Sequence, residues 1–522
     1  MMKKTLLFLF ITFINVFYNA QDGTLDTSFN TTGKFFLDTV FNYPYNNTEV
    51  IADIVEQPDG KLLILGKSNT SSGFFQPVFC KVFRLNTDGT LDTTFGNNGI
   101  FSYSTDAYVH NLFSNLNKLI LQPDGTIFVI GYGKEYQTDI GKTTMIKLSS
   151  NGIMDTSFGN NGIGRYYGGG ISGVLAYNGY YYLYGGSSND ALIIKMDTNG
   201  NIDYNFNGVG YLTQDIDNEI NNFQKMIIKD NKLIAFGTKL NSNNQIYLTV
   251  CKFDLDGNQD FSYGNSGITS AFLYNEEYSS LNDMKLINGD KYLFSIRGNF
   301  YQLNKYGVLD SSFGINGVKT NPFNRRFDCV QFTEDGKIIM SKGLITGYFS
   351  NYMSVNTVKL NSDFNVDSNF GTNGESTINI FPNYHYEQYS YKIKQLNNGK
   401  ILVGGSITIT PNPNVPSIKN ENYFILRYNN SVNTLKTNDL IADSNNFQIY
   451  PNPAYDIINI KTNKELKNIE IFDSSGKIVK TQERALKRID ISDLQTGMYI
   501  LKAFDGKKSL SSMFLKKGSD KP

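Results

Sequence analysis

The residues best suited to chemistry are aspartates that recur with the same neighbours along the chain. A Gly lies three residues before the Asp in six of the seven copies, and Phe364 takes its place in the last copy. In every copy an aromatic ring lies three residues after the Asp, and a Gly follows four residues after the ring. The aspartates are Asp26, Asp92, Asp155, Asp203, Asp260, Asp310 and Asp367, and the rings are Phe29, Phe95, Phe158, Phe206, Tyr263, Phe313 and Phe370. A catalyst is needed once, not once per repeat. We therefore predict that each Asp accepts backbone N–H bonds in a turn and each ring fills a seam between repeats.

Calcium is the alternative that this spacing leaves open. Asn86-Thr-Asp88-Gly89-Thr-Leu-Asp92 places oxygen-bearing side chains at near-alternate positions beside a Gly, as loops that bind hard cations do. Asp254-Leu-Asp256-Gly257 followed by Asp260 is similar. However, no copy has the distal bidentate Glu of an EF-hand, and Ser149-Ser-Asn-Gly152 has fewer carboxylates. We predict no cofactor and no metal, with calcium in one or two repeats as the alternative.

Nucleophilic and redox chemistry have little support in the sequence. His110 and His385 are the only histidines, and neither lies in a nucleophile, metal or phosphate motif. Cys80, Cys251 and Cys329 are far apart, and an odd number of cysteines argues against a disulfide framework. We therefore predict no catalytic residue and a protein that is not an enzyme.

Strand signals surround each aspartate copy. From Asp26 to Asp367 the mean period is near 57 residues, and repeats of such length indicate solenoids, propellers or arrays. Most repeats hold a hairpin turn, such as Asp59-Gly60 or Asn398-Gly399, between two apolar strands. With four strands in each repeat, the predicted fold is all-β: a seven-bladed β-propeller over residues 21–430. We expect residues 423–428 to pair with the first strand and close the ring, and an open array is the alternative.

These features resemble a known family. The Gly-x-Leu-Asp-x-x-Phe-Gly-x-x-Gly phrase and the Gln57-Pro-Asp-Gly-Lys61 hairpin resemble the bacterial delta-60 β-propeller repeat, most closely at residues 57–162. The resemblance implies a propeller-like fold on an exported protein. It implies no reaction.

The N-terminal residues predict export. Lys3 and Lys4 precede the apolar run of residues 6–17, and Ala20 offers a cleavage point, so residues 1–20 are interpreted as a signal peptide. We predict no membrane-spanning segment after its removal, because no later run approaches ~20 apolar residues. Residues 21–446 hold 32 Lys and Arg against 39 Asp and Glu, which argues against nucleic acid as a partner.

A different pattern begins near the C-terminus. Residues 431–446 are interpreted as a linker, and residues 447–522 as a small immunoglobulin-like β-sandwich of alternating strands. Tyr450-Pro-Asn-Pro453, residues 471–477 and residues 491–501 together resemble the type A sorting domain of the type IX secretion system. That resemblance implies handling by the secretion machinery, removal by a surface sortase, and a secreted or outer-membrane cell-surface location. We expect a monomer.

Function is expected where the repeats differ from one another. Long insertions in the first, second and last repeats are expected on the face opposite the Asp-Gly hairpins, and such loops on a rigid scaffold suit recognition. The candidate ligand-binding residues are Tyr43, Tyr45, Phe74, Phe75, Tyr108, His110, Tyr136, Tyr384, His385, Tyr386 and Tyr389. We predict a binding or adhesion module for an extracellular glycan or protein. The alternatives are a secreted polysaccharide lyase or hydrolase, a calcium-dependent structural surface protein, and loops without function.

Overall fold

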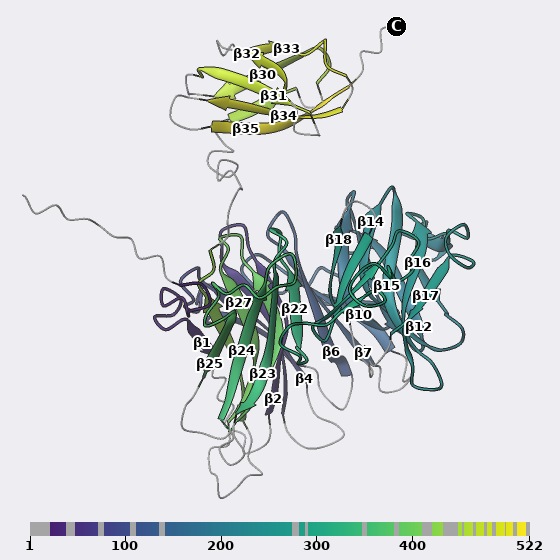
Figure 1. Cartoon of the computed structure of the whole chain (residues 1–522), viewed down its shortest axis with the longest axis vertical. Coiled ribbons are helices and arrows are strands. Elements are labelled where there is room, and N and C mark those ends of the chain that lie inside the picture. The colour runs from purple at the N-terminus through teal and green to yellow at the C-terminus, as the bar shows by residue number, and fades with distance from the viewer. Residues whose placement is uncertain are drawn as a thin grey trace, which may run out of the picture. The chain divides into compact units, whose positions relative to one another are not determined.

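A computed structural model gives the fold (Figure 1). The residues that it describes are 21–37, 47–70, 78–104, 111–134, 141–273, 281–287, 291–346, 352–380, 386–409, 420–431, 447–451, 454–462, 466–473, 478–482, 487–495, 497–504 and 509–517. The chain forms two compact units, Met1–Ser431 and Val432–Pro522.

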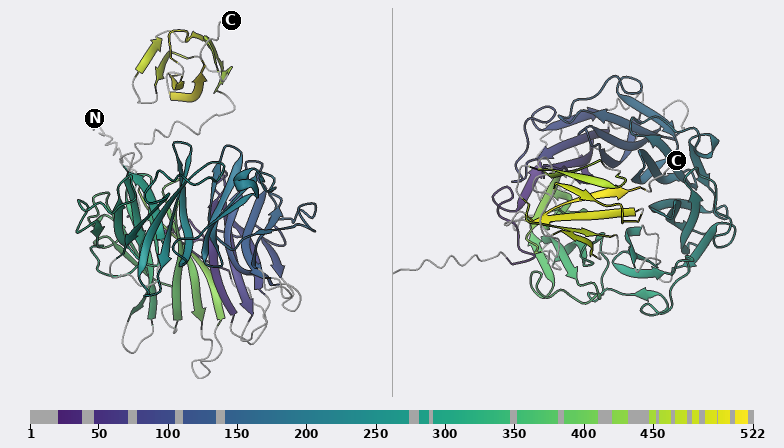
Figure 2. Two further views of the ribbon diagram at one scale, coloured as in Figure 1. Left: turned by 90° about the vertical axis from the view of Figure 1, so that its right-hand side faces the viewer. Right: turned by 90° about the horizontal axis from the view of Figure 1, so that it is seen from above.

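The first unit is built from antiparallel strands in sequence order. Five of its sheets have four strands each, and Figure 2 shows the sheets set around a common axis. Their strands are β6 (Asn111–Leu121), β7 (Ile127–Lys134), β8 (Gly141–Leu148), β9 (Ile163–Tyr167); β10 (Gly170–Tyr177), β11 (Tyr180–Ser187), β12 (Asp190–Asp197), β13 (Tyr211–Gln214); β14 (Ile220–Lys229), β15 (Lys232–Leu240), β16 (Ile246–Asp254), β17 (Ile268–Phe272); β18 (Leu281–Ile287), β19 (Lys291–Ile296), β20 (Asn299–Leu303), β21 (Val318–Lys319); and β22 (Cys329–Phe332), β23 (Ile338–Thr346), β24 (Tyr352–Leu360), β25 (Glu375–Asn379).

The sixth sheet of this unit joins the two ends of the repeat region. It holds β2 (Asn47–Glu56), β3 (Leu62–Thr70), β4 (Val78–Leu85) and β5 (Ile100–Ser104), together with β26 (Tyr386–Gln395), β27 (Ile401–Ile409), β28 (Asn420–Tyr428) and β1 (Lys34–Leu37). A single parallel pair, Asn47 with Asn420, links the two groups of four. β1 pairs antiparallel with β28, from Lys34 opposite Leu426 to Leu37 opposite Tyr423. The expected pairing of the first strand with residues 423–428 is thus confirmed.

The first strand of each group contacts the first strand of the next. We call β2, β6, β10, β14, β18, β22 and β26 the inner strands, because they follow one another as neighbours and β26 in turn contacts β2. The inner strands therefore form a closed succession. A residue at the same position on each strand can consequently face a common space.

Local sequence explains the strands and the turns between them. Gly60, Gly125, Gly336 and Gly399 all have φ between 82° and 87°, which fits the left-handed position of the hairpin turns. The second strands are apolar and buried on both faces, as in Leu62–Leu65 and Ile127–Ile130. Strands buried on both faces are expected where sheets pack against one another on either side.

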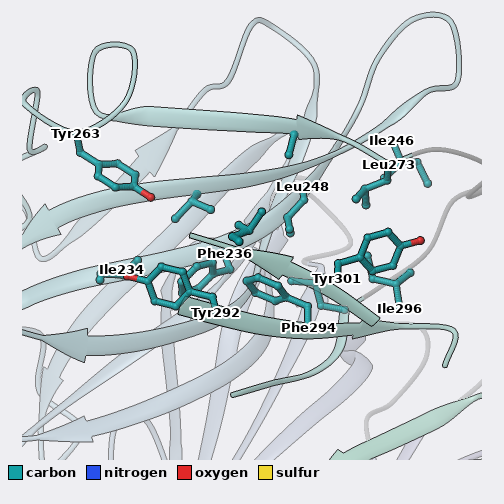
Figure 3. Close-up of a cluster of buried hydrophobic side chains, with 14 residues drawn as sticks. Ile234, Phe236, Ile246, Leu248, Tyr263, Leu273, Tyr292, Phe294, Ile296 and Tyr301 are labelled. Atoms are coloured by element: carbon teal, nitrogen blue, oxygen red, sulfur yellow. The ribbon is translucent and has the colours of Figure 1, made fainter. Parts of the chain in front are cut away.

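The core lies between successive sheets. One cluster brings Phe236 and Leu248 of one sheet against Tyr292 and Phe294 of the next (Figure 3). The ring centroids of Phe236 and Phe294 lie 5.2 Å apart. Each fully buried side chain of this size contributes about 1.5–3 kcal/mol, so the contacts between sheets hold this unit together.

The second unit is a pair of antiparallel sheets. One contains β29 (Phe447–Tyr450), β30 (Ile457–Thr462) and β33 (Arg488–Asp490), and the other contains β32 (Ile478–Gln482), β31 (Asn468–Phe472), β34 (Gly497–Phe504) and β35 (Ser509–Lys516). Ile458, Ile471, Ile491 and Leu501 are buried in one hydrophobic cluster between them. In neither unit do the described residues include a helix long and apolar enough to cross a membrane.

Candidate functional site in the inner strands

The repeated aspartates are bonded within the scaffold. Asp92 accepts hydrogen bonds from the backbone N–H and the hydroxyl of Thr94 at 3.1 and 2.6 Å. Its other oxygen lies 2.7 Å from Arg84 Nε and 2.8 Å from Lys61 Nζ. Asp26 repeats the pattern with Ser28 and Arg427. Each carboxylate therefore fixes its turn and pairs with a cation of its own sheet, as the scaffold interpretation predicts.

These contacts lower the pKa of the repeated carboxyl groups. Burial alone would raise the pKa of Asp92, but hydrogen bonds from Lys61 and Thr94 outweigh it and hold the pKa well below its usual range. At Asp310, the hydrogen bond from Lys291 is the main cause of the lowered pKa, followed by that from Ser312. The pKa values of Asp26, Asp155, Asp203, Asp260 and Asp367 are lowered as well.

Each motif ring packs on the next repeat. Phe95 is fully buried, and its ring lies against Gly152, where an added Cβ would come within 2.6 Å of it. The last ring, Phe370, lies against Gly23 at the start of the chain, and Gly371 N donates to Asp22 O at 2.7 Å. The seam contacts therefore also join the last repeat to the first.

In the loops considered as calcium sites, the carboxylates already accept hydrogen bonds from residues of the same loop. Asp88 accepts from Thr90, and Asp254 accepts from the backbone N–H groups of Asp256 and Asn258. Over the described ranges, no three His, Cys, Asp or Glu residues are grouped so that they could hold a metal ion.

The predicted aromatic loop surface lies almost wholly outside the described residues. This applies to Tyr43, Tyr45, Phe74, Phe75, Tyr108, His110, Tyr136, Tyr384 and His385. Tyr386 and Tyr389 belong to β26, but the structure describes only their backbone. The surface therefore remains a prediction.

The structure instead reveals a ring of residues at one register position of the inner strands. Each member lies opposite the second strand of its group, as Asp53 lies opposite Leu65 and Lys392 opposite Gly404. We call this set the channel ring: Asp53, Lys118, Gly173, Lys225, Asp283, Cys329 and Lys392. A register shift directly precedes six of them. Such bulges re-aim side chains and are frequent beside functional sites.

Six residues of the channel ring, all except Gly173, line a cavity of about 390 Å³. Two of its aspartates are paired: Asp53 Oδ1 lies 3.4 Å from Lys118 Nζ, and Asp283 Oδ1 lies 3.4 Å from Lys225 Nζ. Asp53 also accepts from Leu119 N at 3.1 Å, and Asp283 from Phe332 N at 2.8 Å. Both carboxylates therefore bridge neighbouring inner strands, while about a quarter of the surface of each lysine side chain stays exposed, 27% in both cases.

Lys392 differs from the other two lysines. Within the described part of the chain, no hydrogen bond or ion pair engages its ammonium group. Its pKa is lowered to about 8, chiefly by burial and then by the charge of Lys118, with Lys225 acting in the same direction and Asp53 opposing. The cavity thus holds a cation that its neighbours do not neutralise.

The remaining ring positions are uncharged. Cys329 is buried, which raises the pKa of its thiol to about 12, and its Sγ lies 3.7 Å from Ser341 O. At Gly173, the phenol oxygen of Tyr184 occupies the place of a side chain, since an added Cβ would lie 2.1 Å from it. Only Asp and Lys therefore supply charge to the ring.

Sequence reasoning missed the channel ring, although a signal was present. Asp53, Lys118, Cys329 and Lys392 each lie seven residues before the hairpin glycine of their repeat. An alignment of the repeats on Gly60, Gly125, Gly336 and Gly399 shows that the residue type at this position changes from repeat to repeat, while its distance from the hairpin glycine stays the same.

Two families match parts of the chain. Residues 57–95 and 122–158 match the β-propeller domain of unknown function DUF5122, and residues 448–517 match the secretion system C-terminal sorting domain. The chain is a β-propeller protein with a C-terminal sorting domain of the type IX secretion system. This propeller protein is accordingly secreted or attached at the outer-membrane surface, and the secretion machinery handles its sorting domain. Both resemblances inferred from sequence motifs are confirmed.

Solved structures with distant similarity include a β-propeller domain and proteins of other descriptions. The β-propeller domain of the trilobed protease from Pyrococcus furiosus is 8% identical, with 73% of this chain and 94% of that chain covered and a TM-score of 0.35. PorZ, a surface component of the type IX secretion system of Porphyromonas gingivalis, is 11% identical, with 90% and 81% covered and a TM-score of 0.18. The GH43_1 enzyme from Xanthomonas citri is 10% identical, with 48% and 83% covered and a TM-score of 0.26. No curated protein matches the chain.

Proposed function

We propose that the mature protein is a seven-bladed propeller, residues 21–430, which binds an extracellular glycan or protein and does not transform it. In this proposal residues 431–446 are a linker, and residues 447–522 are an immunoglobulin-like domain that a surface sortase removes. The closed succession of inner strands and the pairing of β1 with β28 support the blade number. We further propose a monomer that uses no cofactor and binds no nucleic acid.

The channel ring is the observation that carries the binding role. Turn aspartates and seam rings recur from repeat to repeat, whereas the ring position holds Asp, Lys, Gly or Cys. A position that varies within a repeated frame, beside a cavity with an unneutralised cation, suits selective recognition.

The predicted aromatic loops are a second part of this proposal. Tyr384, His385 and Tyr386 directly precede or begin β26, the inner strand that carries Lys392. A ligand longer than the cavity that ran along β26 toward Tyr386 would reach this segment of the chain. Loops on a rigid scaffold commonly add such contacts.

A combined binding and degradation screen tests the proposal. The exported protein would be applied to a glycan array, to candidate surface proteins and to polysaccharide solutions, with and without calcium. We expect binding without released oligosaccharides and without a calcium requirement. Release of oligosaccharides would contradict the non-enzymatic role, and binding only with calcium would favour the calcium-dependent alternative.

Replacing Tyr384, His385 and Tyr386 together by Ala distinguishes binding by the aromatic loops from binding by the channel ring. If the loops contribute, this variant binds large ligands less tightly but keeps its affinity for ligands that fit the cavity. Unchanged affinity for every ligand would show that the loops have no role in binding.

A further inference from the structure

We infer that the channel ring binds a carboxylate group of a small ligand, such as an acidic sugar, with Lys392 as its main contact. This inference rests on the proposed binding function and specifies its ligand chemistry.

The charge of the site fits one carboxylate. The channel ring holds three lysines and two aspartates, which leaves a surplus of one positive charge while Lys392 is protonated. The wider lining adds Lys394 and Asp328, so the surplus is unchanged. A monoanion would neutralise the site. A phosphate dianion would instead leave excess negative charge beside Asp53 and Asp283, which is unfavourable in a partly desolvated space.

Because the two aspartates of the channel ring are already paired with Lys118 and Lys225, Lys392 is the lysine available to bind an anion. Asp53 and Asp283 are held by lysines and by backbone N–H groups of adjacent inner strands. Lys118 and Lys225 each keep donors beyond the one directed at aspartate, because an ammonium group has three. A carboxylate on Lys392 would therefore also find the two flanking lysines, and would relieve the repulsion between the three cations.

The size of the cavity limits the ligand. At about 390 Å³ it lies near the lower end of the range for ligand pockets, roughly 300–1,000 Å³. Such a volume suits one small molecule or the end of a chain. Its polar lining favours a hydroxyl-rich ligand over an apolar acid.

Isothermal titration of the exported protein tests the inference. The probes are sodium glucuronate, D-lactate, neutral glucose and inorganic phosphate, against the wild type, Lys392→Met and a matched control, Lys305→Met. Lys305 is an exposed lysine on the turn after β20, and its removal changes the net charge equally. Met replaces the apolar stem of the lysine and removes only its ammonium group, and melting curves show whether each variant is folded.

We expect wild type and Lys305→Met to bind glucuronate alike, and Lys392→Met to bind it about ten- to a hundredfold more weakly. D-lactate should bind measurably but more weakly than glucuronate, which separates an acidic sugar from a general organic acid. Glucuronate affinity should also fall as pH rises above about 8, where Lys392 loses its proton. Lys392 faces Asp53, Lys118, Lys225, Asp283, Asp328 and Cys329 in the cavity. This fall in affinity should be absent in Lys392→Met, which has no ammonium group at that position.

Several results would overturn the inference. One is that Lys392→Met binds glucuronate as tightly as the wild type. The others are that the wild type binds glucose as tightly as glucuronate, or binds phosphate more tightly than glucuronate. Binding of array ligands that Lys392→Met leaves unchanged would refute the channel ring alone and spare the binding function. Turnover of a bound glycan would refute the binding function itself.

Discussion

At the residue scale, a single carboxylate performs two tasks in each repeat. Asp92 fixes its turn through Thr94 and neutralises Arg84, whose side chain is only 8% exposed. Removing a charge from such a buried pair leaves its partner uncompensated. The sequence pattern predicted the turn role correctly. It did not predict the cation partner, because Arg84 and Asp92 become neighbours only when the strand and the turn fold together.

We expect Asp92→Asn to lower the free energy of unfolding by about 3–5 kcal/mol, as for other broken buried pairs. Asp155→Asn is the matched control, because Asp155 and its partner Lys147 are 32% and 25% exposed. Exposed pairs contribute about 0–1 kcal/mol. Urea denaturation of both variants measures the difference. Equal losses in the two variants would contradict the role assigned to the buried pair.

At the element scale, the seams between sheets combine ring packing with tight backbone turns. Gly152 has φ of +76° and lies directly under the Phe95 ring. The repeat of Gly and aromatic residues made this seam predictable from sequence. The bulges of the inner strands could not be predicted in the same way, because they leave no Gly or Pro signal at Asp53 or Lys392.

Gly152→Ala should destabilise the protein by about 2–4 kcal/mol, through the left-handed backbone and through displacement of Phe95. Gly170→Ala is the control, since no atom lies within 4 Å of an added Cβ there. We expect Gly170→Ala to change the free energy of unfolding by no more than about 1 kcal/mol. Thermal melting monitored by circular dichroism compares the two, and an equal loss at both sites would refute the seam contact.

At the scale of the whole molecule, the same carboxylates make stability depend on pH. The folded pKa values of the repeated aspartates lie below the value of about 3.9 expected in the unfolded chain. Their stabilisation is therefore complete above about pH 4 and is lost as pH falls through the folded values. We expect cooperative acid unfolding below about pH 4. A melting temperature that is constant from pH 6 to pH 2 would contradict this linkage.

Export and architecture could be predicted from sequence because both depend on repeated or family-specific motifs, such as Asp124-Gly125 and Tyr450-Pro-Asn-Pro453. An alignment of the repeats on their hairpin glycines marks the channel-ring position as variable, but the grouping of its charges around one cavity could not be predicted. Those charges come from residues far apart in the sequence that only the closed succession of inner strands brings together. Lys118 and Lys392 are such a pair.

A crystal structure of the exported protein with bound glucuronate is the most direct test of this account. It should show seven four-stranded blades closed by β1 on β28, with the glucuronate carboxylate within hydrogen-bond distance of Lys392 Nζ and beside Lys118 and Lys225. Glucuronate bound only at the aromatic loops, with the channel ring empty, would contradict the account.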